Sequence, residues 1–311
     1  MGGTRETIAE LIGRDAVTVV VTDSGLGGLS VAGGIERRAR EAGVYRSLRV
    51  VFANALPEAR RGYNTMATDE EKARVFGGAL AGMVRAFRPD LVLVACNTLS
   101  VLLPRVVRAS DVPLLGIVGM GVEMLEERLR AVPGSVAIVF GTETTAAAGT
   151  HRAMLLERGI EAERVITQAC PLLAREIEDD ASSAAVVSMV DRFAGEAVER
   201  ITRPLEVVIA GLCCTHYGYV ADRFAGALRR AGATAVETVD PNQRMAEALF
   251  PPGRTPATRA AQVSVRVVSR AGISDAEVRS IATLVEPVSA PTAAALRGWE
   301  QMRDLFTYPL L

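Results

Sequence analysis

The sequence predicts an α/β fold in which parallel sheets are covered by helices on both faces. Short apolar segments rich in β-branched residues alternate with longer stretches that have the spacing of helices. The apolar segments are continuous, which is typical of parallel strands buried on both faces. With 311 residues, 49% of them hydrophobic, and a net charge of −1, the chain can bury such sheets. This doubly wound architecture binds ligands at the carboxyl ends of its strands.

Eight segments have the composition of buried strands, and the stretch between the second and third has helical spacing. The helix is expected over residues 68–87. The strands are expected over residues 16–21, 48–53, 90–96, 113–118, 135–140, 164–170, 206–212 and 233–239.

The segment past residue 250 begins with "PPGRTPATR" (251–259), which is typical of a linker or a long loop. A further strand is expected over 262–268, followed by a helix that opens with a capping box of Ser274 and Glu277. A last helix is expected over 292–306. We interpret these elements as additions to the first half of the chain.

Two strand ends recur along the chain. "VVVTDSG" and "AIVFGTE" both end in small polar residues, and "LVLVACNT" and "VIAGLCCT" both end in cysteine and threonine. The offset from Asp23 to Gly141 equals the offset from Cys96 to Cys214. Equal offsets indicate two pseudosymmetric halves, with Cys96 and Cys214 approaching one cleft from opposite sides.

The two halves divide the chain into two expected α/β domains. The first combines residues 1–115 with about 230–311 and carries Asp23 and Cys96. The second spans residues 116–229 and carries Thr142, Cys214 and His216. The active site is expected in the cleft between them.

The composition also excludes several classes of protein. A balanced charge gives no basic field for nucleic acid, and no apolar run is long enough for a membrane helix. The N-terminal segment carries charges throughout and lacks the apolar core of a signal peptide. Four cysteines in so long a chain do not make a disulfide scaffold. We therefore expect a cytoplasmic protein with reduced thiols.

Cysteine chemistry at the two strand ends is the main functional signal. Adjacent strand residues point to opposite faces, so Cys213 and Cys214 cannot both line one cleft. The match with Cys96 favours Cys214 as the residue of the site, and Cys213 and Cys170 as core residues. Zinc is the alternative, but the Cys-Cys-x-His spacing fits its usual ligand patterns poorly, so no metal is expected.

Two opposed thiols can invert a carbon centre. A thiol at a strand end followed by a helix N-terminus is expected to have a lowered pKa, which makes the thiolate accessible. One thiolate takes a proton from carbon, and the opposite thiol returns one to the other face. No cofactor is needed.

The motifs "VVTDSGLGGLSV", "VACNTLS", "FGTETT", "QACPLL" and "GLCCTHYG" together resemble the glutamate racemase family, over residues 17–248. This family lies within the aspartate/glutamate racemase superfamily of cofactor-independent, two-cysteine enzymes. The resemblance implies two flavodoxin-like halves, with Cys96 and Cys214 as acid/base thiols and Asp23 and His216 assisting one thiol each. It implies a small-molecule amino acid or dicarboxylate as ligand and a role in amino-acid metabolism and cell-wall biogenesis. Both a monomer and a homodimer stay open.

Further residues resemble the groups of the family that hold the amino and carboxylate groups of the substrate. They are Asp23, Ser24, Asn97, Thr98, Thr142, Thr145, Thr215 and His216. Thr142 and Thr145 stand where a helix is expected to begin, so exposed N–H groups there could bind a carboxylate.

Each assisting residue has a structural alternative. Asp23 could be a helix N-cap before its glycine-rich turn, and His216 could be a hydrogen-bonded structural histidine. Glu178 matches a carboxylate near the second thiol in the family, but it could equally be a solvated charge on a helix.

One segment departs from the family, which has the form D-x-A-R-x-P-Y-G where this chain reads "ANALPEARRGYN" (53–64). Asn54 stands in place of the aspartate, and Tyr63 takes the part of the tyrosine if the loop is longer. Arg60 and Arg61 are added; turned inward they would pair with a second carboxylate, and turned outward they would be solvated. We therefore expect a racemase or epimerase whose substrate need not be glutamate.

Two other functions remain at this stage. One is a superfamily isomerase or decarboxylase that acts on a small (di)carboxylic acid. The other is a non-catalytic protein that binds phosphate or another small anion in the "DSGLGGLS" turn, which lacks the Gly-Lys-Ser/Thr ending of a P-loop.

Overall fold

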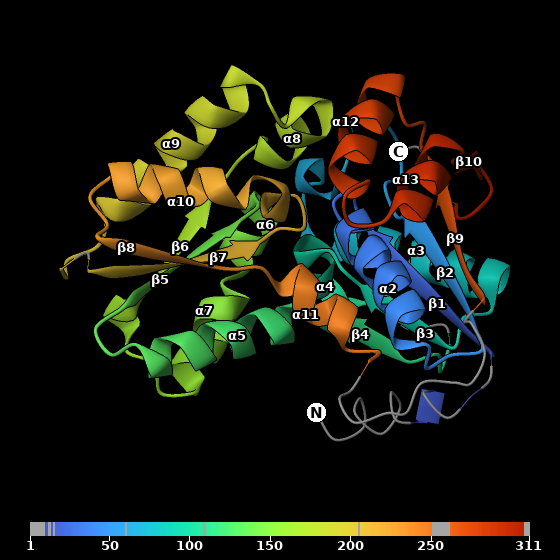
Figure 1. The fold of residues 1–311 in the computed structure, drawn as a ribbon, viewed down its shortest axis with the longest axis horizontal. Coiled ribbons are helices and arrows are strands. Elements are labelled where there is room, and N and C mark those ends of the chain that lie inside the picture. Colours follow the sequence, from blue (N-terminus) through green and yellow to red (C-terminus); the bar gives the residue numbers. More distant parts are fainter. Residues whose placement is uncertain are drawn as a thin grey trace. The chain divides into compact units, whose positions relative to one another are not determined.

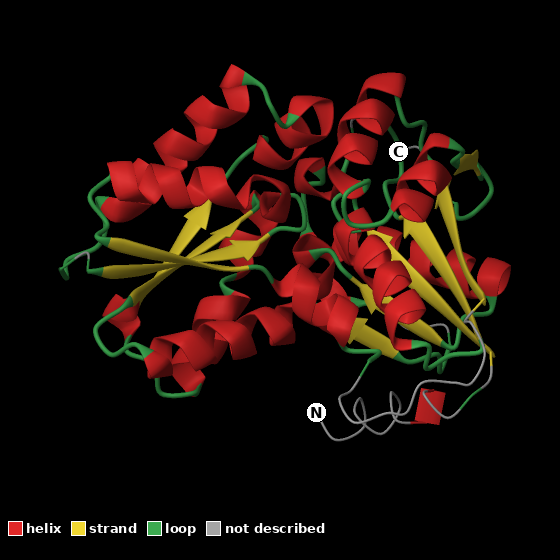
Figure 2. Ribbon diagram, in the orientation of Figure 1, coloured by secondary structure: helices red, strands yellow, loops and turns green. Residues whose placement is uncertain are grey.

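The computed structural model describes residues 10–11, 14, 16–59, 61–107, 110–204, 206–250 and 262–307. The chain forms two compact units, Met1–Gly116 with Asn242–Leu311 and Ile117–Pro241. The expected linker at 251–259 and Arg60 lie outside the described residues. Each unit is an α/β layer structure with a parallel sheet between helices (Figures 1 and 2).

The first unit contains a parallel sheet with the strand order β10-β9-β2-β1-β3-β4 (Figure 1). Its strands are β1 (Ala16–Asp23), β2 (Ser47–Asn54), β3 (Leu91–Val94), β4 (Leu114–Gly116), β9 (Gln262–Ser269) and β10 (Glu300–Gln301). Its helices are α2 (Leu29–Ala42), α3 (Asp69–Phe87), α4 (Asn97–Leu102), α11 (Pro241–Glu247, which begins at the boundary), α12 (Asp275–Val285) and α13 (Ala290–Arg297). Short 3₁₀ helices span Tyr63–Thr65 and Leu103–Arg105.

The second unit contains a parallel sheet with the order β6-β5-β7-β8. Its strands are β5 (Val136–Gly141), β6 (Val165–Ala169), β7 (Val207–Cys213) and β8 (Ala235–Val239). Its helices are α5 (Val118–Ala131), α6 (Glu143–Ala148), α7 (Thr150–Glu157), α8 (Leu173–Asp180), α9 (Ala184–Val198) and α10 (Ala221–Arg230). Short 3₁₀ helices span Ala162–Arg164 and Tyr217–Val220.

The two sheets share one topology. If the first four strands of each unit are numbered along the chain, both sheets run in the order 2-1-3-4. Crossovers between parallel strands are right-handed. Helices that connect strands to one side of the first strand therefore cover one face of the sheet, and helices that connect strands to its other side cover the opposite face. The reversal lies between β1 and β3 in one unit and between β5 and β7 in the other, which is where ligands bind in such folds. The expectation of two similar doubly wound halves is confirmed.

All eight segments predicted as strands in the two halves form strands, and the central strands β1, β3, β5 and β7 are the ones whose apolar side chains are buried on both faces. In β1, for example, Val19, Val20 and Val21 are completely buried. The long helix is also confirmed as α3, and its N-cap Thr68 accepts a hydrogen bond from the backbone N–H of Glu71.

The C-terminal additions agree with the prediction except at their end. The strand is β9, and α12 opens with the capping box in which Ser274 and Glu277 exchange hydrogen bonds. The predicted helix over 292–306 is wrong in extent, because α13 ends at Arg297 and is capped by Gly298. Glu300 and Gln301 instead pair with β9 as a short parallel strand.

The boundary of the second unit follows from strand pairing. β8 pairs with β7 over residues 235–239, so the second unit extends to Pro241 instead of ending near residue 229. Within the described part of the chain, no helix combines the length and the apolar character needed to cross a membrane.

Two glycines of α3 allow a matched test of how its neighbours pack. A Cβ at Gly82 would lie 1.9 Å from the carbonyl oxygen of Leu305, whereas a Cβ at Gly78 would lie 3.8 Å from that of Thr307. We expect Gly82→Ala to lower the free energy of unfolding by about 1–3 kcal/mol, because backbone must move. Gly78→Ala should raise it by about 0.5–1 kcal/mol through helix propensity. Denaturant unfolding measures both, and a Gly82→Ala variant at least as stable as the wild type would contradict the packing described.

Candidate active site

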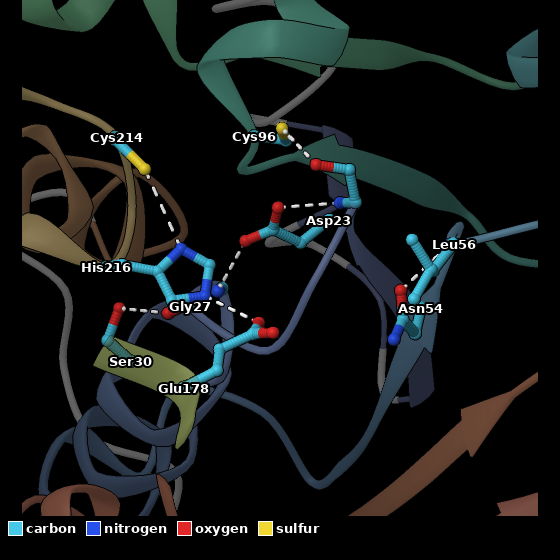
Figure 3. A network of polar contacts seen from close by, with 11 residues as sticks. Asp23, Gly27, Ser30, Asn54, Leu56, Cys96, Glu178, Cys214 and His216 are labelled. Atoms are coloured by element: carbon cyan, nitrogen blue, oxygen red, sulfur yellow. Dashed lines mark hydrogen bonds and ion pairs between the residues drawn. The ribbon is translucent and has the colours of Figure 1, made fainter. Parts of the chain in front are cut away.

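The first thiol cluster consists of Asp23, Ser24 and Cys96, at the carboxyl ends of β1 and β3 (Figure 3). Cys96 follows β3 and is the N-cap of α4, where its Sγ accepts a hydrogen bond from the backbone N–H of Leu99 at 3.4 Å. The Oγ of Ser24 lies 3.1 Å from the same sulfur. The side chain of Cys96 is therefore held at the point where the strand order reverses.

Asp23 organises the turn that leads from β1 to α2. Its carboxylate oxygens accept hydrogen bonds from the backbone N–H groups of Ser24 and Gly28, each at 2.6 Å. The N-cap of α2 is Gly28, so Asp23 is not itself the helix cap. A Cβ at Gly28 would lie 3.0 Å from the Asp23 side chain, so the turn closes this tightly because residue 28 is glycine.

The protonation of Cys96 differs from the expectation. Burial raises the pKa of the Cys96 thiol well above its ordinary value, and the charge of Asp23 raises it further. Hydrogen bonds from Ser24 and from the Leu99 N–H lower it by less. The lowered pKa expected from the helix N-terminus is therefore wrong for Cys96, because burial and a neighbouring carboxylate outweigh the N–H groups. The thiol form is favoured.

Other candidates of the first unit lie beside this cluster. Asn97 and Thr98 open α4 directly after Cys96 and are almost completely buried. Asn54 ends β2 and lies opposite Asp23 in the strand register, where its Oδ1 accepts a hydrogen bond from the Leu56 N–H at 2.9 Å.

Tyr63 is engaged within the loop that follows β2. Its hydroxyl donates to the carbonyl oxygen of Ala55 at 3.0 Å, and its ring packs edge-on against Phe76. This placement favours a role in closing the loop. Arg61 is exposed and lies 3.6 Å from Glu58, as in the outward alternative.

The second thiol cluster consists of Cys214, His216 and Glu178 in the second unit (Figure 3). The Sγ of Cys214, directly after β7, lies 3.6 Å from Nδ1 of His216. Nε2 of His216 lies 2.7 Å from a carboxylate oxygen of Glu178 on α8. Glu178 is therefore paired with His216, and the solvated-charge alternative is wrong.

The ionisation of His216 follows from these two partners. Burial on its own lowers the pKa of His216, but the charge of Glu178 and the hydrogen bonds with Cys214 and Glu178 outweigh it. The pKa is raised well above its usual value. A protonated imidazole beside a cysteine sulfur stabilises the thiolate form of that cysteine.

The remaining threonine candidates flank the second cluster. Thr142 follows β5 and is the N-cap of α6, where its Oγ1 accepts from the Thr145 N–H at 3.4 Å. The strand end Gly141 pairs with Cys213, which brings this helix start to the same sheet edge as Cys214. Thr215, next to Cys214, is 2% exposed.

The other two cysteines are core residues, as expected. Cys213 and Cys170 are buried, and burial raises the pKa of each thiol above its usual value. Among the described residues, no group of three or more His, Cys, Asp or Glu side chains is arranged to hold a metal ion.

Two backbone contributors were not identified from the sequence. The Gly28 and Leu99 N–H groups bind Asp23 and Cys96, respectively. The glycine-rich turn after Asp23 was the available signal for Gly28. No signal existed for Leu99 beyond the helix start.

A sequence model of the Asp/Glu/hydantoin racemase family matches residues 6–249. The chain belongs to this family. Glutamate racemase of Aquifex pyrophilus is 30% identical over 203 residues, which cover 63% of this chain and 70% of that protein. The family assignment makes the chain an isomerase of the racemase type, with glutamate racemases among its relatives.

Solved racemase structures share the fold. Glutamate racemase isoform RacE1 from Bacillus anthracis has a TM-score of 0.62 at 20% identity, covering 88% of this chain and 93% of that chain. The Francisella tularensis glutamate racemase in complex with D-glutamate has a TM-score of 0.62 at 17% identity, covering 88% and 94%. At these identities the likeness establishes the architecture.

The two histidines of the racemase allow a direct test of the second thiol cluster. His151 is buried, and burial lowers its pKa to about 4, so it is an internal control for His216. An NMR titration should show His216 protonated well above its ordinary pKa of about 6.5, and Glu178→Gln should lower the pKa of His216 without moving that of His151. A wild-type His216 that titrates at its ordinary pKa would contradict the described pairing.

The same shift has a consequence for stability. Because the folded-state pKa of His216 lies above the unfolded value, its proton stabilises the fold fully below about pH 6.5. This contribution is lost as the pH rises through the folded-state pKa. Denaturant unfolding at a series of pH values above about 6.5 should show the free energy of unfolding of the wild type fall as His216 loses its proton. In Glu178→Gln this fall should occur at lower pH.

Proposed function

We propose that this racemase inverts the α-carbon of a small amino acid without a cofactor, with Cys96 and Cys214 as the two acid/base groups. The observation that carries the proposal is the equivalent position of the two thiols. Each follows the third strand of a sheet with the order 2-1-3-4, and each has its own charged partner, Asp23 or His216.

The two clusters favour complementary starting states. Burial and Asp23 favour the thiol form of Cys96, whereas protonated His216 places a positive charge beside the sulfur of Cys214. The Cys214 thiolate takes the α-proton of the L-isomer, and the Cys96 thiol gives its proton to the opposite face of the carbon. The D-isomer leaves with Cys214 as thiol and Cys96 as thiolate. The reverse reaction uses the same groups in exchanged roles.

Polar side chains beside each thiol are proposed to hold the amino and carboxylate groups of the substrate. Ser24, Asn97 and Thr98 would serve from the first unit. Thr142, Thr145 and Thr215 would serve from the second unit, with their hydroxyl groups near the start of α6 and the end of β7. Such groups also lower the energy of the carbanion-like transition state when they pair with the carboxylate.

The substrate is proposed to be a small amino acid, with glutamate as the first compound to test. Two relatives that are 30% and 26% identical to this chain are named glutamate racemases. One structure with a similar fold is a glutamate racemase in complex with D-glutamate. Selection among side chains is expected from the loop after β2, which departs from the family at Asn54 and adds Arg60 and Arg61 before Tyr63.

Substitution of the two thiols tests the proposal. Each direction needs one base and one acid, so Cys96→Ala and Cys214→Ala should each lower turnover by roughly 10²–10⁴-fold or more in both directions. Cys213→Ala is the matched control: it removes a neighbouring buried thiol and should lower stability more than turnover. Chiral chromatography of each L- and D-amino acid after incubation measures the outcome.

Full racemisation by either Cys96→Ala or Cys214→Ala would refute the two-thiol mechanism. A product that has lost carbon dioxide or changed double-bond geometry would instead support a superfamily decarboxylase or isomerase. A wild-type chain that converts no amino acid, but binds inorganic phosphate, would support the anion-binding alternative.

A further inference from the structure

The C-terminal strap, defined as residues 298–307, is the part of the described chain that follows α13. It lies beyond residue 249, where the match with the family ends. The strap first runs beside β9, where Gln301 pairs with Ser269 and the Met302 N–H donates to the Ser269 carbonyl at 2.8 Å. This pairing makes the strap the edge of the first sheet (Figure 1).

The strap then packs against α3. Leu305 and Phe306 are both 2% exposed. The Leu305 carbonyl lies directly over Gly82, and it accepts a hydrogen bond from Arg85 at 3.4 Å. The strap is thus fixed on one side by β9 and on the other by α3.

Arg270 connects the strap to the loop that follows β2. Its Nε donates to the Phe306 carbonyl at 2.9 Å, and its guanidinium carbon lies 5.6 Å from the centre of the Phe306 ring. Its Nη1 donates to the carbonyl oxygen of Pro57. The backbone of Arg270 is held in turn, because its carbonyl accepts from Gln301 at 3.4 Å.

The β2 loop, defined as the described residues 55–59 and 61–63, begins beside the first thiol cluster. The Ala55 N–H donates to the Asp23 carbonyl at 2.7 Å, and the Leu56 N–H donates to Asn54. The loop closes where the Tyr63 hydroxyl donates to the Ala55 carbonyl. A displacement of Pro57 would therefore change the segment that follows Asn54 and that is bonded to Asp23 through the Ala55 N–H.

We propose that Arg270 is a positioning residue for substrate binding, which fixes the β2 loop against the C-terminal strap. This inference rests on the proposed function, because it assigns the β2 loop to the wall that contacts the substrate side chain. The strap thereby takes part in substrate selection without contacting the substrate.

The guanidinium group suits this task because of its shape. Its N–H groups lie in one plane and point in fixed directions, so one side chain donates to the Pro57 and Phe306 carbonyls together. A lysine has one flexible ammonium and cannot hold both carbonyls at the same fixed separation. Arg270→Lys therefore keeps the charge and removes the bridge.

Hydrogen–deuterium exchange measures the loop without reference to activity. We compare the wild type with Arg270→Lys, Arg270→Ala and the control Arg266→Ala. Arg266 lies on β9, which ends directly before Arg270. It pairs with Glu300 of the strap at 2.5 Å, and its guanidinium lies over the ring of Phe87 in α3 and not over the β2 loop. Losing hydrogen bonds from a charged donor should speed exchange in residues 55–66 by about tenfold or more in both Arg270 variants. Arg266→Ala should leave this segment unchanged.

Steady-state kinetics with the amino acid that the wild type converts gives the second readout. Loss of a fixed wall weakens the binding of the substrate equally in the ground state and in the transition state. KM should therefore rise by about tenfold while kcat changes much less. The ratio of kcat/KM between preferred and disfavoured amino acids should become smaller in the Arg270 variants and stay unchanged in Arg266→Ala. Thermal unfolding shows whether each variant is folded. If Arg270→Ala does not fold, Arg270→Lys still tests the proposal, because it retains a long side chain.

Equal exchange of residues 55–66 in the Arg270 and Arg266 variants would overturn the proposal. Faster exchange with unchanged KM and unchanged preference would also overturn it, because the loop would then not bind substrate. A wild-type chain that racemises no amino acid refutes the proposed function, and the exchange experiment still reports separately whether Arg270 holds the loop.

Discussion

Burial of a thiol at the carboxyl edge of a parallel sheet is the constraint on which the rest of the structure depends. Burial disfavours the thiolate, so a cysteine there changes its protonation only with the help of neighbouring charges and hydrogen-bond donors. The reversal of strand order brings such neighbours to the same edge. Asp23 ends β1, which pairs with the strand that leads to Cys96. Helix α6 begins directly after β5, which pairs with the strand that leads to Cys214.

The two units repeat the topology but not the electrostatics. Cys96 lies beside a carboxylate and a hydroxyl, whereas Cys214 lies beside an imidazole that is itself paired with Glu178. A carboxylate opposes the formation of a second negative charge, and an imidazolium favours it. One fold, used twice, thus places a negative charge beside one thiol and a positive charge beside the other.

Local sequence predicted most of the fold because the strands are apolar and the helices carry their own caps, as in α3 and α12. The last helix was wrong because Glu300 and Gln301 pair with β9, a contact that local propensity does not contain. The positions of Cys96 and Cys214 were predictable from the strand ends. The pKa of Cys96 was not, because it depends on burial and on Asp23, which is distant in the sequence. The pairing of Glu178 with His216 is equally non-local.

Isotope incorporation at low conversion tests the two-thiol account most directly. One enantiomer of the amino acid that the wild type converts is incubated in deuterated water, and both enantiomers are analysed by chiral separation and mass spectrometry. If Cys96 and Cys214 serve opposite faces, the product enantiomer carries deuterium at the α-carbon, while the remaining substrate keeps its hydrogen. Deuterium in both enantiomers from the start would show that a single group takes and returns the proton, and would contradict the account.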